Sequence, residues 1–361
     1  MIAASGRYLT YRSRWDSFER VSSPRQPWSS KTGNNFALVS PAIRIVSGSL
    51  GLVFGERLVV FCDRSRVPLA QALIDVAEEF KARAQLVVLE DVALPSDDKL
   101  LDYVLSLLAD AQASVLLLGT EHSRPLRQAF VVATEQLRVR HAHIIGLSQR
   151  GFVEGFAADA SRVADMLQAV GRRLAGARKL SYSTPAGTQL EIAMPTDARW
   201  TERGQLIRPG KFSNLPGGQL NALCEAVDGV YVVDGSSNVA FAGSGDLRSN
   251  PVSFTVVSGV VERVSCSNEA VKKDVEAFLG SEEHMNRVGH LVIGANPGVL
   301  GPIGEVMVDA CAPGLQIVFG WTNRTVTGAN WSTQASLALA GSSGDLNVDG
   351  AALLRGGRFV L

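Results

Sequence analysis

The sequence predicts an α/β protein in which a doubly wound parallel sheet precedes a mostly antiparallel, β-rich domain. Three observations predict it. The chain has 361 residues, of which 46% are hydrophobic and 19% charged, enough for a large core and two domains. In the first half, short apolar strands alternate with amphipathic helices, which is typical of parallel βαβ units. After Lys179 the pattern changes to short strands of alternating polarity separated by Gly and Asn turns.

Residues 1–45 are rich in Ser, Arg, Pro and Trp and show neither helical nor strand periodicity. We expect an N-terminal arm there. Residues 1–25 contain no apolar stretch of the kind that an export signal needs, so a cytoplasmic protein is expected.

Residues 46–180 contain the βαβ rhythm in order. Strands are predicted at 58–63, 85–89, 114–119 and from His143, and helices at 68–83, 99–111, 125–137 and 159–176. Because parallel strands need crossover helices, the sheet should be covered on both faces.

Residues 181–361 should form the β-rich domain. Its predicted strands include QLEIAMP from Gln189, GVYVVDG from Gly229, NVAFAG from Asn238 and SFTVVSGVVERVSCS from Ser253. One helix is clear, from Glu269 to Leu279, where apolar residues recur at helical spacing.

Charge and hydropathy exclude several classes of partner. The 35 basic residues balance 35 acidic ones, and no run of clustered Lys and Arg offers a nucleic-acid surface. No apolar stretch approaches the roughly 20 residues that cross a bilayer. The four cysteines are widely spaced and contain no C-x-x-C pair, so we expect reduced thiols rather than disulfides or a zinc knuckle.

Local catalytic signatures are absent. The chain has no G-x-S-x-G, H-E-x-x-H or P-loop motif, and the turn Arg64–Arg66 after the first strand lacks the glycines of a dinucleotide site. His141 and His143 would share one strand face as metal ligands, but the favoured interpretation is a strand end near solvent. Glu121 and His122 follow a strand at the carboxyl edge of the predicted sheet, where ligands bind in such folds, although a lone loop histidine is usually just exposed.

Four segments resemble, in order, the M29 family of thermophilic metal-dependent aminopeptidases, which has a ring-opening iron relative. They are Asn214–Gln219 (NLPGGQ), Gly289–Gly298 (GHLVIGANPG), Gly314–Gly320 (GLQIVFG) and the closing Asn347–Gly350 with Gly356–Val360. The resemblance spans about residues 50–361. It implies an α/β domain, a β-rich domain, a cleft between them and a homodimer.

The departures from the M29 pattern fall on its metal ligands. Gln219 stands where the family has a glutamate, and Gln316 where it has a histidine. His290 stands at a carboxylate position of the peptidases at which the ring-opening relative also has histidine. The family's closing H-x-D pair falls on residues 334–336, of which Gln334 and Ser336 replace the ligands.

These replacements predict a protein without a catalytic metal. Zinc, manganese, cobalt and iron sites use imidazole, carboxylate and thiolate ligands, whereas neutral amides bind such ions weakly. Without a metal, bound water keeps its high pKa and the hydrolytic nucleophile is lost. We therefore expect no catalytic residue, no metal and no other cofactor.

The remaining cleft is predicted to bind peptide, because glutamine amides complement a peptide backbone. Trp321, Arg324 and Trp331 lie in a Gly- and Thr-rich stretch and are typical anchor residues. The predicted peptide-binding residues are Gln219, His290, Gln316, Trp321, Arg324, Trp331, Gln334 and Ser336. Two alternatives remain: the glutamines satisfy one another in a collapsed cleft, or the tryptophans belong to the core.

Two functions follow. In the first, the chain resembles peptide-binding proteins of ribosomal peptide natural-product pathways such as that of crocagin. It would hold the leader of a precursor peptide for modifying enzymes, in the old cleft or on an exposed sheet edge. In the second, it is a peptide hydrolase that releases a modified core, with His290 or His284 as base and Glu305, Asp309 or Cys311 downstream.

Overall fold

The first half of the chain forms the predicted parallel sheet with helices on both faces. The computed structural model describes residues 36–119, 124–322 and 329–361. Sheet A has the strand order β2-β1-β3-β4-β8, and all its pairings are parallel. Its strands are β1 (Arg57–Cys62), β2 (Arg83–Val88), β3 (Ala113–Leu118), β4 (Arg140–Ile145) and β8 (Lys211–Asn214). The doubly wound prediction is confirmed.

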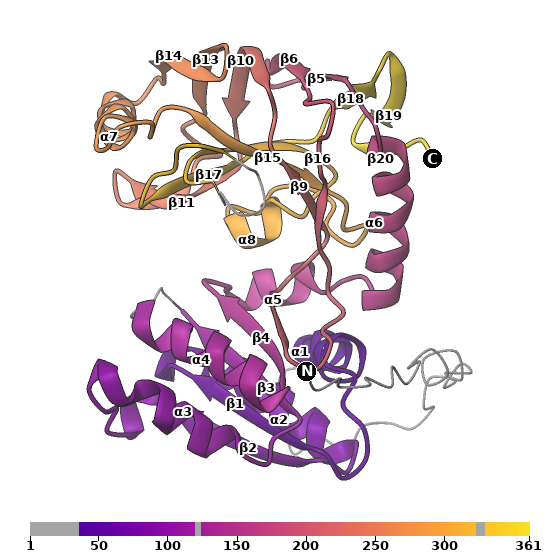
Figure 1. Cartoon of the computed structure of the whole chain (residues 1–361), viewed down its shortest axis with the longest axis vertical. Coiled ribbons are helices and arrows are strands. Elements are labelled where there is room, and N and C mark those ends of the chain that lie inside the picture. Colours follow the sequence, from indigo (N-terminus) through magenta and orange to yellow (C-terminus); the bar gives the residue numbers. More distant parts are fainter. Residues whose placement is uncertain (1–35, 120–123, 323–328) are drawn as a thin grey trace, which may run out of the picture. The chain divides into compact units, whose positions relative to one another are not determined.

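Alternation along β1 explains the two helical layers around sheet A (Figure 1). Leu58 and Val60 face one hydrophobic core, whereas Val59 and Phe61 face another. The first core contains residues of helices α1, α2 and α5, and the second contains residues of α3 and α4. The helices are α1 (Phe36–Ile43), α2 (Val67–Glu79), α3 (Leu100–Leu108), α4 (Arg124–Leu137), α5 (Gln149–Gly155), α6 (Ala160–Leu174), α7 (Glu269–Leu279) and α8 (Val306–Asp309).

Two boundaries differ most from the prediction. Residues 36–45, expected in the arm, form α1 and the start of a π-helical turn (Arg44–Ser49), and they bury Leu38 and Ala42 in the core. The predicted helix at 68–83 ends at Glu79, because Lys81 adopts a left-handed conformation and β2 begins at Arg83. Residues 1–35 lie outside the described part of the chain.

The second half forms two antiparallel sheets, as expected. Sheet B comprises β5 (Lys179–Ser183), β6 (Gln189–Ala193), β10 (Ala226–Val233), β13 (Val252–Val257), β14 (Val260–Ser265), β18 (Asp345–Val348), β19 (Ala351–Arg355) and β20 (Arg358–Phe359). Sheet C comprises β7 (Thr201–Arg203), β9 (Gln219–Ala222), β11 (Ser236–Phe241), β12 (Ser244–Asp246), β15 (Val288–Gly294), β16 (Gly314–Gly320) and β17 (Ser336–Ala340). One hydrophobic core joins residues of both sheets with those of α6 and α7.

One segment connects sheet C to sheet A. The chain runs through β7 at the edge of sheet C, then through β8 at the edge of sheet A, and returns to sheet C as β9. β8 pairs with β4 in parallel, so a strand from beyond residue 180 completes the first sheet. Residues 35–361 accordingly form one compact unit. The division at residue 180 stays a prediction.

None of the described helices is both long and apolar enough to span a membrane.

Candidate functional site

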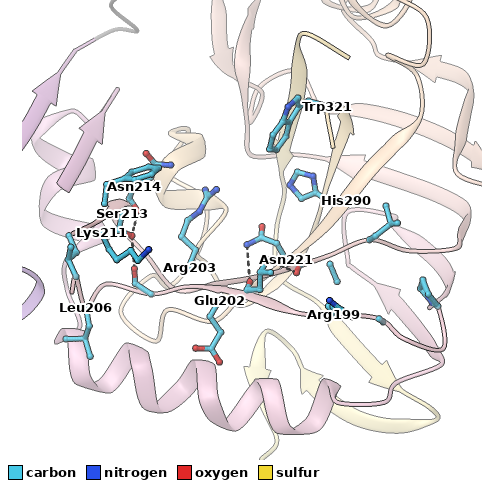
Figure 2. Close-up of a pocket in the computed structure, with 18 of the residues that line it drawn as sticks. Arg199, Glu202, Arg203, Leu206, Lys211, Ser213, Asn214, Asn221, His290 and Trp321 are labelled. Carbon is cyan, nitrogen blue, oxygen red and sulfur yellow. Dashed lines mark hydrogen bonds between the residues drawn. The ribbon is translucent and has the colours of Figure 1, made fainter. Parts of the chain in front are cut away.

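The connecting segment lines a cleft of about 690 Å³ (Figure 2). One wall comes from the loop after β6, from β7 and β8, and from the residues between these two strands. The other comes from Asn221 on β9, His290 on β15 and Trp321, which directly follows β16. β7 is the last strand of sheet C and β8 the last strand of sheet A. The edge strands of two sheets therefore contribute to the lining, and the unpaired side of an edge strand can accept a further strand.

The motif Asn214–Gln219 makes this crossing possible through its two glycines. A side-chain carbon at Gly217 would approach the backbone of Gly204 to 2.5 Å, and one at Gly218 would come within 3.0 Å of Asn296. Gly218 also has a φ of 116°, which L-residues rarely adopt. Asn296, from the second M29-like motif, donates its amide to the carbonyl of Gly217 at 3.0 Å. The two motifs thus hold one corner of the cleft.

Arg203 is one of the cations that line the cleft. Its Nη1 donates to Oε1 of Gln219 at 3.3 Å, and its side chain keeps an exposed face. Enough protein surrounds the guanidinium that desolvation lowers its pKa, but arginine remains charged at neutral pH. The neighbouring Glu202 points to the other face of β7, toward Gly171 of α6, and does not neutralise Arg203 (Figure 2).

His290 lies across the cleft from β7, half-buried on β15. Burial, and after it the positive charge of Arg203, lowers its pKa to about 4, although a hydrogen bond with the backbone of Trp321 acts in the opposite direction. Its ring packs edge-to-face against Trp321, with 6.1 Å between the ring centroids. His290 is therefore neutral at pH 7.

Gln219 is buried behind Arg203. Its Nε2 lies 3.4 Å from Sγ of Cys311, whose thiol also contacts the carbonyls of Pro216 and Met307. Burial raises the pKa of the Cys311 thiol to about 12. Cys311 is thus a protonated structural thiol rather than a nucleophile.

The side chains around Gln219 do not suit the metal ion that the M29 family binds. The amide of Gln219 is occupied at both ends, by Arg203 and by Cys311. A guanidinium beside His290 would also repel a divalent cation. Among the described residues, no group of three His, Cys, Asp or Glu side chains could hold a metal ion.

Gln316 lies away from this cleft, in the core between the sheets. Its Oε1 lies 3.1 Å from the hydroxyl of Tyr231 and accepts from the backbone N–H of Gly341 at 2.8 Å. Its Nε2 donates back to the carbonyl of Gly341 at 3.3 Å. On β16 it pairs with Val292, so strand β15 separates it from β9 and Gln219. The two glutamines do not satisfy each other.

Of the other predicted residues that the structure describes, only Trp321 lines the cleft. It is 41% exposed. Trp331 packs against Arg287, whose guanidinium carbon is 5.0 Å from the ring centroid. Gln334 is exposed, with its backbone N–H on the carboxylate of Glu282, and Ser336 begins β17. Arg324 lies outside the described residues, as do Glu121 and His122.

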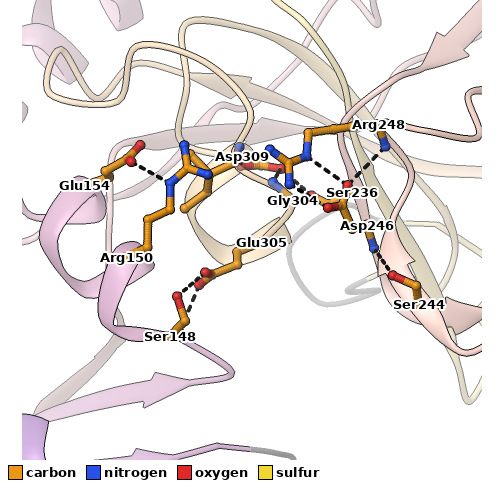
Figure 3. A network of polar contacts seen from close by, with 11 residues as sticks. Ser148, Arg150, Glu154, Ser236, Ser244, Asp246, Arg248, Gly304, Glu305 and Asp309 are labelled. Atoms are coloured by element: carbon orange, nitrogen blue, oxygen red, sulfur yellow. Dashed lines mark hydrogen bonds and ion pairs between the residues drawn. The ribbon is translucent and has the colours of Figure 1, made fainter.

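The residues named for a hydrolytic site have structural partners instead (Figure 3). Glu305 accepts from the backbone N–H and hydroxyl of Ser148 before α5. Asp309 is fully buried and accepts from Ser236 at 2.6 Å and from the backbone N–H groups of Ile303 and Gly304. His284 packs against Trp331.

The pair His141 and His143 corrects a sequence interpretation. A strand end near solvent was expected, but both side chains are buried, because β8 pairs beyond β4 and makes β4 an interior strand. Nδ1 of His141 lies 2.6 Å from the hydroxyl of Ser114, and the two imidazole centroids are 4.7 Å apart.

Sequence reasoning missed most of the cleft, including Arg203, Lys211, Phe212 and Asn221. One signal was available. Of the 13 residues from 199 to 211, four are Arg or Lys, and this basic stretch leads directly into the glycine motif.

Comparison with known proteins identifies the fold. No family model matches the sequence, and no curated protein does. AmpT from Thermus thermophilus superposes with a TM-score of 0.60 at 15% identity, over 90% of this chain and 99% of that one. 2,5-Dihydroxypyridine dioxygenase from Pseudomonas putida KT2440 gives a TM-score of 0.59 at 16% identity, over 90% and 96%. The chain has an M29 aminopeptidase-like fold. Identities this low establish the fold alone, and the M29-like fold confirms the expected architecture.

Proposed function

We propose that this chain is a non-catalytic peptide-binding protein of M29-like fold. In the cleft bordered by β7 and β8 it would hold a segment of a ribosomal precursor peptide, such as its leader, for modifying enzymes of a natural-product pathway. The observation that carries the proposal is the lining of the cleft: the edge strands of two sheets contribute to it, and Arg203 lies there in front of the buried Gln219, the residue that the resemblance places at a metal-ligand position. A homodimer and a cytoplasmic location belong to the same proposal.

The dimensions support an extended peptide. A volume of about 690 Å³ lies within the range of ligand pockets, roughly 300–1,000 Å³. An edge strand offers backbone N–H and C=O groups that pair with any sequence, while side-chain pockets supply the selectivity. Asn214 and Asn221 add amide donors and acceptors from opposite walls.

The test selects binders from a displayed library of random dodecapeptides on the immobilised full-length chain. Enriched peptides are then synthesised with a fluorophore and titrated by fluorescence polarisation. Asn221→Trp, which fills the cleft, should weaken binding at least about tenfold, the loss of roughly 1.4 kcal/mol. Leu300→Trp is the matched control, because Leu300 is 92% exposed and does not line the cleft. If Asn221→Trp binds the peptides as tightly as wild type and has the same melting temperature, the peptides bind somewhere other than this cleft.

The same peptides decide between binding and hydrolysis. After incubation with stoichiometric protein, mass spectrometry should recover them intact. Metal content after exposure to zinc, manganese and iron should stay below about a tenth of an equivalent, because the described residues form no metal site. Cleaved peptide would instead establish the hydrolase, and about one bound metal would contradict the metal-free cleft.

A further inference from the structure

Within the described part of the chain, the cations of the cleft have no acidic partners. Arg199, Arg203 and Lys211 all line it, and none forms an ion pair with a described residue. The acidic residues of its lining are Asp197 and Glu202, and Glu202 faces α6. The cleft therefore presents an excess of positive charge, although the whole chain is neutral.

Among these cations, Arg203 is positioned to bind an anionic ligand directly. Figure 2 shows its guanidinium between Lys211 and Asn214 on one side and His290 on the other. A guanidinium carries five N–H donors in a planar fork, and Oε1 of Gln219 is the one acceptor that they meet among the described residues. Gln219 anchors one end of the fork, so its other donors can meet a ligand. A planar acceptor with two oxygens fits that geometry best.

The neighbouring His290 carries no positive charge that would compete with Arg203 for such an anion. It is neutral at pH 7 and sits on the far wall, where Trp321 covers it. An anion bound at Arg203 would offset the positive charge that, after burial, lowers the pKa of the imidazole. The pKa of His290 should therefore rise from about 4 when the anion binds.

Apolar side chains flank the cation. Trp321, Phe212 and Leu206 line the cleft, and they are 41%, 43% and 47% exposed. Their grouping in one cleft, rather than their exposure alone, offers apolar surface that a ligand can cover. A ligand with an acidic group next to an apolar side chain would satisfy both features.

We propose that the cleft recognises a peptide carboxylate next to an apolar residue, with Arg203 as the group that binds the carboxylate. This inference rests on the proposed peptide-binding function and names its ligand chemistry. The carboxylate is a C-terminal one or that of an acidic side chain. Lys211 contributes long-range attraction, and Trp321 and Phe212 pack against the apolar side chain.

The test compares three peptides on the full-length chain. Acetyl-Ala-Ala-Phe has a terminal carboxylate, acetyl-Ala-Glu-Phe-amide has a side-chain carboxylate, and acetyl-Ala-Ala-Phe-amide has none. Each is titrated against ¹⁵N-labelled protein while the indole N–H resonance of Trp321, assigned with Trp321→Phe, is followed. At least one acidic peptide should bind about tenfold more tightly than the neutral one, as for one charge-assisted pair. The tighter of the two identifies the source of the carboxylate.

Variants locate the effect. Arg203→Gln should bind all three peptides equally, whereas Arg208→Gln should keep the preference, because Arg208 is exposed and does not line the cleft. In wild type the preferred acidic peptide should also raise the NMR-measured pKa of His290.

The outcomes separate the two proposals. Equal binding of all three peptides at Trp321 overturns carboxylate recognition and leaves peptide binding intact. Persistence of the preference in Arg203→Gln also overturns it. If no peptide shifts the Trp321 resonance, the carboxylate inference fails, and the library selection then tests peptide binding by itself.

Discussion

Gln219 and Gln316 are two buried glutamines of the same sheet with different surroundings. Gln316 is enclosed by Tyr231 and both backbone groups of Gly341, so its hydrogen bonds stay inside the protein. Gln219 is tied to Cys311 on its inner side, but its oxygen meets the cleft cation Arg203. The same residue type, predicted for the same role, thus serves the core in one place and positions a binding group in the other.

Gln316→Ala should destabilise the protein more than any other variant considered for these two glutamines. The change removes the partner of a buried backbone N–H and of the Tyr231 hydroxyl and leaves a cavity, so the free energy of unfolding should fall by about 3 kcal/mol. Urea denaturation followed by circular dichroism measures this loss.

Gln219→Ala is the matched variant. It should cost only about 1 kcal/mol, because Arg203 and Cys311 keep contact with solvent or with other acceptors. It should instead weaken peptide binding, since Arg203 loses its anchor. Similar stability losses in both variants would show that the two glutamines have equivalent structural roles.

Most of the fold could be predicted, because hydrophobic periodicity is a local property. The helix Glu269–Leu279 was located to the residue, with Asn268 accepting from its first N–H groups. β8 was not foreseen, because four residues with mostly polar side chains become a strand only by pairing with β4. The burial of His141 and His143 depends on that pairing, so it was missed as well.

The candidate site was less predictable, because it depends on which segments meet. The glycine motif and His290 were found by resemblance, and the structure brings them to one cleft with Trp321. Arg203 belongs to a three-residue edge strand without periodicity. Only the return of the chain from β8 to β9 places it against Gln219.

The second prediction concerns pH and the interior of sheet A. Burial, followed by the charge of Arg127, lowers the pKa of His143 to about 4, against an ordinary value of 6.5. Between these values the unfolded chain binds a proton that the folded chain does not, so stability falls as the pH falls. From pH 6.5 to 5 this histidine should cost about 1.5 kcal/mol.

His143→Gln cannot titrate, so its stability should depend less on pH by that amount, as measured by urea denaturation at several pH values. His284→Gln is the control, since its ring is partly exposed rather than buried inside a sheet. An unchanged slope in His143→Gln would mean that the histidine is protonated in the fold.

The smallest predicted effect separates the two tryptophans that the sequence placed together. Trp331 packs on Arg287 and His284 and does not line the cleft, so Trp331→Ala should remove about 0.5–1 kcal/mol of stability and leave peptide affinity unchanged. Trp321→Ala should mainly weaken peptide binding, because its ring is 41% exposed in the cleft and packs against His290 there. Thermal melts and fluorescence polarisation on both variants measure stability and affinity. Loss of affinity in Trp331→Ala would extend the binding surface to the segment before β17, beyond the edge strands that we propose hold the peptide.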